Sequence, residues 1–270
     1  MILALKLVLT PAVMIGATLA GRRWGGAVSG WLIGLPLTSG PLVLVLALEH
    51  GRHFAARTAT GSLSGAIAEA AFCVGYALSP RLPLVAASIG FAVAAVAVHA
   101  LPLVALAGAV PLALVLGLRA LPPFPARTAT SVRPPRWDLP ARAVVAAAAV
   151  IVLAAAATTI GARLTGLLAV YPLYSAVLAT FARRHEGRVA AVGLLRGLLV
   201  GLFSFTAFYS VLAFSLPRTG ITGAFAAAIF AALIVQGASL LRILRRPASR
   251  SERDLQPAAP ASASRAAPFR

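Results

Sequence analysis

Charged side chains are scarce in this chain, and acidic ones are almost absent. Only 11% of the 270 residues are charged and only six are Asp or Glu, while 60% are hydrophobic. Soluble domains average about 25% charged residues. A soluble domain of this size needs more polar surface than that to cover its core. The composition therefore excludes an ordinary soluble protein and indicates one whose solvent is lipid.

Cysteine and catalytic motifs are also lacking. Cys73 is the single cysteine, which excludes an intramolecular disulfide and a cysteine-based metal site. The chain contains no G-x-S-x-G, P-loop or H-E-x-x-H sequence. We therefore expect no enzyme, no catalytic residue, no metal and no cofactor.

Basic residues are plentiful, but their distribution does not favour a nucleic-acid partner. The net charge is +18 and Lys6 is the only lysine. The arginines fall in short gaps between apolar runs, as they do when they orient a membrane protein. Twelve lie in alternate gaps on one side and seven after the ninth apolar run, against four on the other side. This bias predicts a bacterial cytoplasmic (inner) membrane protein with its N-terminus outside and its C-terminus in the cytoplasm.

The apolar runs predict an all-α, polytopic transmembrane helical bundle of about nine spans, because about 18–20 apolar residues cross the hydrocarbon core. The first run is followed, not preceded, by Arg22-Arg23, which favours a retained span over a cleaved signal peptide. The expected spans are residues 3–20, 31–48, 60–79, 83–100, 103–121, 141–160, 165–182, 197–216 and 221–241.

Two homologous halves are visible when the chain is shifted by 136 residues. Without a gap, Gly30 falls on Gly166, Pro36 on Pro172 and Ser39 on Ser175, and Gly51-Arg52 falls on Gly187-Arg188. The alternative is a chance match between two Ala/Leu/Gly-rich segments, which does not easily explain Pro and Gly-Arg in one register.

The shift also predicts how the two halves are oriented. Four-span repeats at 1–101 and 141–244 would be joined by 102–140, a linker span with a Pro/Arg loop, and followed by a disordered tail at 245–270. Stepping over five spans, an odd number, reverses direction across the bilayer. The halves are therefore expected to be inverted, as in many secondary transporters.

The motif from Gly166 to Ser175, GLLAVYPLYS, followed by the loop that ends at Arg188, resembles the GlpM-like family of small bacterial membrane proteins. Members have about four spans, so the resemblance implies that each half corresponds to one such unit. The first half departs from the motif at Gly34, Gly40 and Pro41. The family supplies no established substrate.

The Gly/Pro-rich starts of the second and seventh spans are the first candidate site, because interrupted helices at matched positions mark transporter sites. A simple kink is the alternative. If the repeat is inverted, Pro36 is expected near the cytoplasmic face and Pro172 near the outer face, which counts against one shared site unless a helix dips. The candidate pathway residues here are Gly34, Pro36, Ser39, Gly40, Tyr171, Pro172, Tyr174 and Ser175.

Glu69 is the second candidate, because it is the only acidic residue inside an expected span. An intramembrane carboxylate is costly and rarely faces lipid, so it suits reversible protonation; a hydrogen-bonded packing role is the alternative. It follows Gly61 and Gly65 at four-residue steps. These glycines and their equivalents Gly197 and Gly201 are expected to pack helices together.

Residues 49–53, Glu-His-x-x-His, with His185-Glu186 in the matched gap, have ligand chemistry. Inversion would place the two loops on opposite faces, so we expect no shared metal.

The leading hypothesis is a small-solute transporter or exporter, with Glu69 as the candidate for proton coupling. The alternative is a non-transporting scaffold or accessory subunit. The expected partners are the lipid bilayer and an unidentified small solute, without nucleic acid, and a homo-oligomer stays open.

Overall fold

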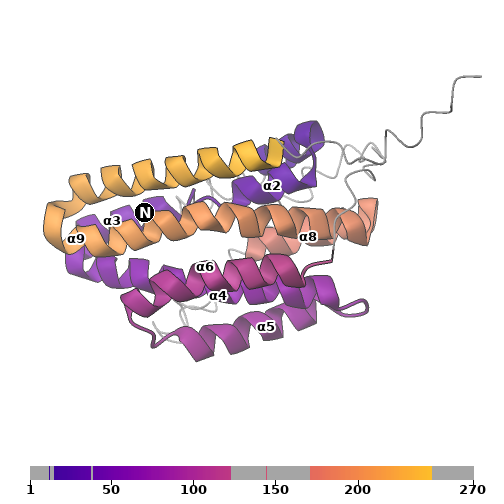
Figure 1. The fold of residues 1–270 in the computed structure, drawn as a ribbon, viewed down its shortest axis with the longest axis horizontal. Helices are drawn as coiled ribbons and strands as arrows, with labels where there is room; N and C mark the ends of the chain where they lie inside the picture. Colours follow the sequence, from indigo (N-terminus) through magenta and orange to yellow (C-terminus); the bar gives the residue numbers. More distant parts are fainter. Residues whose placement is uncertain (1–11, 13–14, 38, 123–143, 145–170, 245–270) are drawn as a thin grey trace, which may run out of the picture.

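The computed structural model describes residues 12, 15–37, 39–122, 144 and 171–244, and Figure 1 shows their arrangement. This part of the chain is built from helices and contains no strand, which confirms the predicted all-α class. Most of the expected first span, nearly all of the sixth, the Pro/Arg loop and the tail lie outside the described residues.

The helices of the described part are α2 (Gly26–Ile33), α3 (Ser39–His50), α4 (Arg52–Leu78), α5 (Pro83–Val98), α6 (Leu103–Ala120), α8 (Leu173–Glu186) and α9 (Arg188–Leu244). Short connections join the helices from α2 to α6, and a single residue separates α8 from α9. Residues 15–24 are helical as well. Proline marks several helix starts: Pro83 opens α5, Pro102 precedes α6 and Pro172 precedes α8, where its missing N–H costs no intrahelical bond.

Three of the described helices are long and apolar enough to cross a membrane. They are α4, α6 and the stretch Arg188–Ser239 of α9, whereas α5 is apolar but shorter. Figure 1 shows that α9 folds back on itself, with an orange leg and a yellow leg lying antiparallel. The turn lies at Gly220 (φ 78°) beside Pro217, and Ser204 Oγ joins the legs by donating to Ala232 O at 3.0 Å. The membrane class is thus supported, and the count of nine stays a prediction.

Single glycines separate helices where the sequence predicted longer loops. Gly51 (φ 86°) stands between α3 and α4, and its repeat equivalent Gly187 (φ 88°) stands between α8 and α9. Positive φ is open to glycine at little steric cost. The sequence predicted loops at 49–59 and 183–196, and this was wrong, because all of these residues except Gly51 and Gly187 are helical. An apolar window finds only the lipid-facing part of a helix, and the helix continues for as long as backbone hydrogen bonds can form.

The central helix α4 and the first leg of α9 run antiparallel. The start of α9 lies at the end of α4, since Arg188 Nη2 donates to Ala77 O at 2.8 Å. Val74 of α4 and Leu199 of α9 both flank Gly117 of α6. The two helices are equivalent under the shift of 136 residues.

Arginines tie several helix ends together at one end of the bundle. Their guanidinium groups donate to carbonyls at or just beyond the C-terminal ends of α4 and α6, which lack intrahelical donors. The bonds run from Arg183 Nη2 to Pro80 O (2.6 Å), from Arg188 Nη2 to Ala77 O (2.8 Å) and from Arg196 Nη1 to Leu121 O (3.0 Å). This end carries the gaps that were predicted to be rich in arginine.

Candidate functional site

Glu69 lies on α4 and meets the start of α8. Ser175 Oγ donates to Glu69 Oε1 at 3.0 Å, and Ser175 itself is fully buried. No basic side chain in the described part of the chain pairs with Glu69; Lys6, the partner considered from the sequence, lies outside it. We call Glu69 and Ser175 the Glu69 site. Its carboxylate retains capacity for a proton or a cationic group.

The aromatic ring of Tyr171 packs against the neighbouring part of α4. Its ring meets Phe72 edge-on at 6.0 Å and Phe91 of α5 at 5.5 Å between centroids. Its hydroxyl lies 2.8 Å from Ser88 Oγ of α5. Tyr171 is therefore held on both sides, at a position only two residues before α8 begins at Leu173.

The predicted interruption of the second span is present. Helix α2 ends at Ile33 and α3 begins at Ser39, because Pro36 has no N–H to continue the ladder. Leu37 N instead bonds Leu35 O at 2.8 Å, and Gly40 N bonds Pro36 O at 2.9 Å. In the second half, Pro172 likewise immediately precedes α8. Tyr174 lies in the first turn of α8, and its side chain is outside the described part.

The structure places both Gly/Pro-rich segments against other helices. A Cβ added at Gly34 would come within 2.7 Å of Gly201 Cα, and Gly201 is close to the middle of the first leg of α9. Tyr171 and Ser175 lie beside Phe72 and Glu69, in the C-terminal half of α4. The expectation that Pro36 and Pro172 lie near opposite membrane surfaces stays a prediction.

Two of the four predicted packing glycines lie in a close helix contact. Gly197 faces the backbone of Ala27, and Gly201 faces Trp31 and Gly34, so α2 and α9 touch backbone to backbone. In the first half Gly65 is buried, but Gly61 is exposed and a Cβ added there would have nothing within 4 Å. Equivalent glycines thus have different surroundings in the two halves.

The histidine and glutamate residues near Gly51 and Gly187 lie on helices rather than in flexible loops. His53 is in the first turn of α4, and His185 and Glu186 end α8. Among the residues that could be searched, no group of three His, Cys, Asp or Glu side chains comes together. The side chains of Glu49 and His50 fall outside the described part.

The structure adds polar residues that the sequence did not single out. Tyr76 and Tyr209 are almost fully buried, and neither hydroxyl has a hydrogen-bond partner in the described structure. Trp31 Nε1 donates to Ser239 Oγ at 2.8 Å. Nothing in the sequence separates these residues from ordinary packing aromatics, because tyrosine and tryptophan fill apolar cores as readily as they bind ligands.

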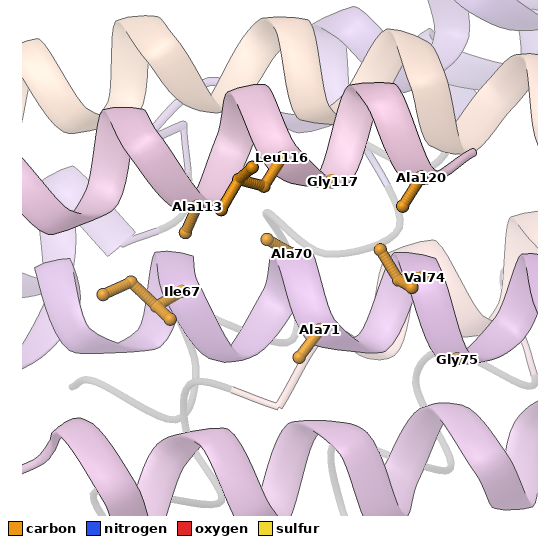
Figure 2. A pocket seen from close by; sticks show the side chains of 9 residues that line it. All are labelled: Ile67, Ala70, Ala71, Val74, Gly75, Ala113, Leu116, Gly117 and Ala120. Carbon is orange, nitrogen blue, oxygen red and sulfur yellow. The ribbon is translucent and has the colours of Figure 1, made fainter.

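An apolar groove of about 520 Å³ runs between α4 and α6, as Figure 2 shows. Small residues form its floor, and no side chain that lines it carries a hydrogen-bonding group; the lining residues are Ile67, Ala70, Ala71, Val74, Gly75, Ala113, Leu116, Gly117 and Ala120. A polar solute would find no hydrogen-bond partner among these side chains. The groove therefore suits an acyl chain or an apolar helix, and the Glu69 site suits polar chemistry.

No family model, no curated protein and no solved structure matches this chain. The resemblance to the GlpM-like family stays a prediction from the motif at 166–175.

Proposed function

We propose that this chain is an inner-membrane transporter or exporter of a small solute in which the Glu69 carboxylate binds the coupling proton. The observation that carries the proposal is the hydrogen bond between Glu69 of the membrane-length helix α4 and Ser175, which lies three residues after Pro172 at the start of α8. A carboxylate at membrane depth without a basic partner is costly, and it marks an ion or solute pathway by default.

The antiparallel crossing of α4 and α9 supports an inverted repeat. These helices are equivalent under the shift of 136 residues, and they run antiparallel, with Arg188 at the start of α9 donating to Ala77 O near the end of α4. A two-fold axis in the membrane plane requires this arrangement. A parallel repeat would instead run equivalent helices in the same direction. The matched glycines Gly51 and Gly187, with nearly equal φ angles, support the same register.

The arrangement supplies a simple transport mechanism. Ser175 belongs to α8, which begins directly after Pro172, so a movement of α8 relative to α4 would break the bond to Glu69. Alternating access in inverted-repeat transporters is such a movement of one repeat against the other. Protonation of Glu69 would remove its charge and lower the cost of exposing it to an apolar surface.

The test is proton uptake into liposomes that contain the purified protein and a trapped pH-sensitive dye. We expect Glu69→Gln to reduce uptake at least tenfold, because glutamine has a similar shape but cannot release a proton. Glu186→Gln is the matched control, since Glu186 is exposed at the end of α8, and it should keep wild-type uptake. Uptake by Glu69→Gln equal to that of the wild type would remove Glu69 from the mechanism.

A second candidate function is a non-transporting scaffold or accessory subunit. The groove between α4 and α6 favours it, because the apolar and mostly small residues that line it suit packing against another apolar helix. In that case the wild type would show no uptake above empty liposomes, and widening Ala71 or Ala113 to leucine would release a bound subunit.

A further inference from the structure

The apolar groove between α4 and α6 has nearly the length of one lipid leaflet. It extends along α4 from Ile67 to Gly75, which is eight residues or about 12 Å. The hydrocarbon core of a bilayer is about 30 Å thick, so each leaflet contributes about 15 Å. Leu116 in the wall of the groove is 53% exposed and Ala120 is exposed as well. The groove is therefore open at the surface of the bundle, where an acyl chain can enter it from the side.

The width of the groove favours an acyl chain over a helix. A volume of about 520 Å³ spread over a length of about 12 Å gives a cross-section of about 40 Å². A helix with a diameter of about 10 Å has a cross-section of roughly 80 Å². A helix would thus rest on the rim of the groove, whereas a flexible hydrocarbon chain can lie inside it along its whole length.

One end of the groove lies where arginines gather at the end of the bundle. Figure 2 shows Ala113 toward one end of the groove and Ala120 at the other. Leu121 directly follows Ala120, and its carbonyl accepts a hydrogen bond from Arg196 at 3.0 Å. The groove thus runs from the interior of the expected membrane layer to the arginine-rich end, which is the predicted cytoplasmic end.

Two exposed arginines lie beside this end of the groove. Arg119 directly precedes Ala120 in the last turn of α6, and Arg81 lies between α4 and α5. Neither belongs to the arginines that bind helix-end carbonyls. Of the acidic residues that the structure describes, only Glu186 lies at this end. Positive charge is therefore in excess here, and clustered basic residues at a cytoplasmic membrane surface attract anionic lipid headgroups.

We propose that the groove and these two arginines form a binding site for an anionic glycerophospholipid of the cytoplasmic leaflet. Its phosphate lies against Arg81 and Arg119, and one of its acyl chains lies in the groove. Lipid tails surround the whole bundle, so the groove alone gives no preference for one lipid over another. The guanidinium groups supply the preference, because they form strong, charge-assisted hydrogen bonds with phosphate. The site goes beyond the proposed transport function and does not depend on it.

The first experiment tests the headgroup. Purified protein is stripped of lipid in detergent, phosphatidylglycerol or phosphatidylcholine with the same acyl chains is added, and bound lipid is counted by native mass spectrometry. We expect the wild type to prefer phosphatidylglycerol at least fivefold and the double variant Arg81→Gln/Arg119→Gln to lose this preference. Arg57→Gln is the control, because Arg57 is exposed near the opposite end of α4, and it should keep the preference. An unchanged preference in the double variant would overturn the site.

The second experiment tests the acyl chain. Phosphatidylglycerol with a photoreactive diazirine in its acyl chain should crosslink to residues 67–75 or 113–120. Ala113→Phe fills the groove and should reduce this crosslinking at least fivefold. Ala105→Phe is the control, because Ala105 is an exposed residue of α6 outside the groove lining, and it should crosslink like the wild type.

Two outcomes of the crosslinking would overturn the proposal. Equal crosslinking of Ala113→Phe and the wild type would mean that the chain does not lie in the groove. A co-purified apolar peptide that Ala113→Phe displaces, without lipid crosslinks at 67–75 or 113–120, would assign the groove to a protein partner instead. A wild type without proton uptake would contradict only the proposed function, because lipid binding is measured without transport.

Discussion

Gln236 is the residue with the largest unmatched hydrogen-bonding capacity in the described part of the bundle. Its side chain is buried, and neither Nε2 nor Oε1 has a hydrogen-bond partner. One turn away, Ser239 accepts the bond from Trp31 and donates to the Gln236 backbone carbonyl at 2.8 Å. The serine is thus satisfied while the amide is not, although the two residues lie about one turn apart on α9.

Replacing Gln236 and replacing Ser239 should therefore change the free energy of unfolding differently. Gln236→Leu removes the buried unmatched amide, so we expect the free energy of unfolding to stay equal or to rise by about 1 kcal/mol. Ser239→Ala leaves Trp31 Nε1 without its acceptor and should lower it by roughly 1–2 kcal/mol. Thermal unfolding of the purified protein measures both. A clear loss of stability in Gln236→Leu would mean that the amide has a partner.

Single residues also show what the sequence could and could not predict about the site. Glu69 was found because an acidic residue in an apolar run has few structural explanations. Tyr209 was not, because a tyrosine among phenylalanines is equally consistent with packing. Ser39 and Ser175 were found only through their position after matched prolines.

At the scale of secondary-structure elements, the contact between α2 and the first leg of α9 depends on the absence of side chains. A Cβ at Gly30 would clash with the carbonyl of Leu194, and one at Gly197 would clash with the carbonyl of Ala27. Both obstacles are backbone atoms, which cannot rotate away. The helices are held by close backbone approach, as in other small-residue membrane interfaces.

The equivalent glycines Gly197 and Gly61 give a matched pair of variants. Gly197→Ala should destabilise the protein by about 1–3 kcal/mol or more, because overpacking forces the helices apart. Gly61→Ala meets open space and should gain roughly 0.5–1 kcal/mol of helix propensity. Unfolding in detergent measures the difference. Equal effects of the two substitutions would contradict the asymmetry between the halves.

Element boundaries were the weaker part of the sequence prediction. The apolar runs located α4, α5 and α6 well, but they started α4 at residue 60 instead of Arg52. The lipid-facing part of a helix is set by hydropathy, whereas its ends are set by local backbone conformation. That is why Gly51 and Gly187, and not the charged stretches around them, mark the real breaks.

At the scale of the whole molecule, the inverted repeat predicts the sides on which equivalent residues lie. His53 and Val189 are equivalent under the shift and are both exposed, near the starts of α4 and α9. In a Cys73→Ala background, His53→Cys should react with an impermeant thiol reagent from outside and Val189→Cys only from the cytoplasm. Labelling of both from one side would mean that the halves are parallel or that α6 does not cross.

The sequence by itself determined that the chain is a helical membrane protein. With 60% hydrophobic and 11% charged residues, it has too few polar residues to form the surface of a soluble domain. It also predicted the break at Pro36, which the structure confirms, and a repeat register, which stays a prediction. The tertiary structure decided the contact of Gly34 with Gly201, the antiparallel packing of α4 and α9, and the meeting of Ser175 with Glu69. Each of these joins residues more than a hundred positions apart, and such contacts depend on how helices pack rather than on local sequence.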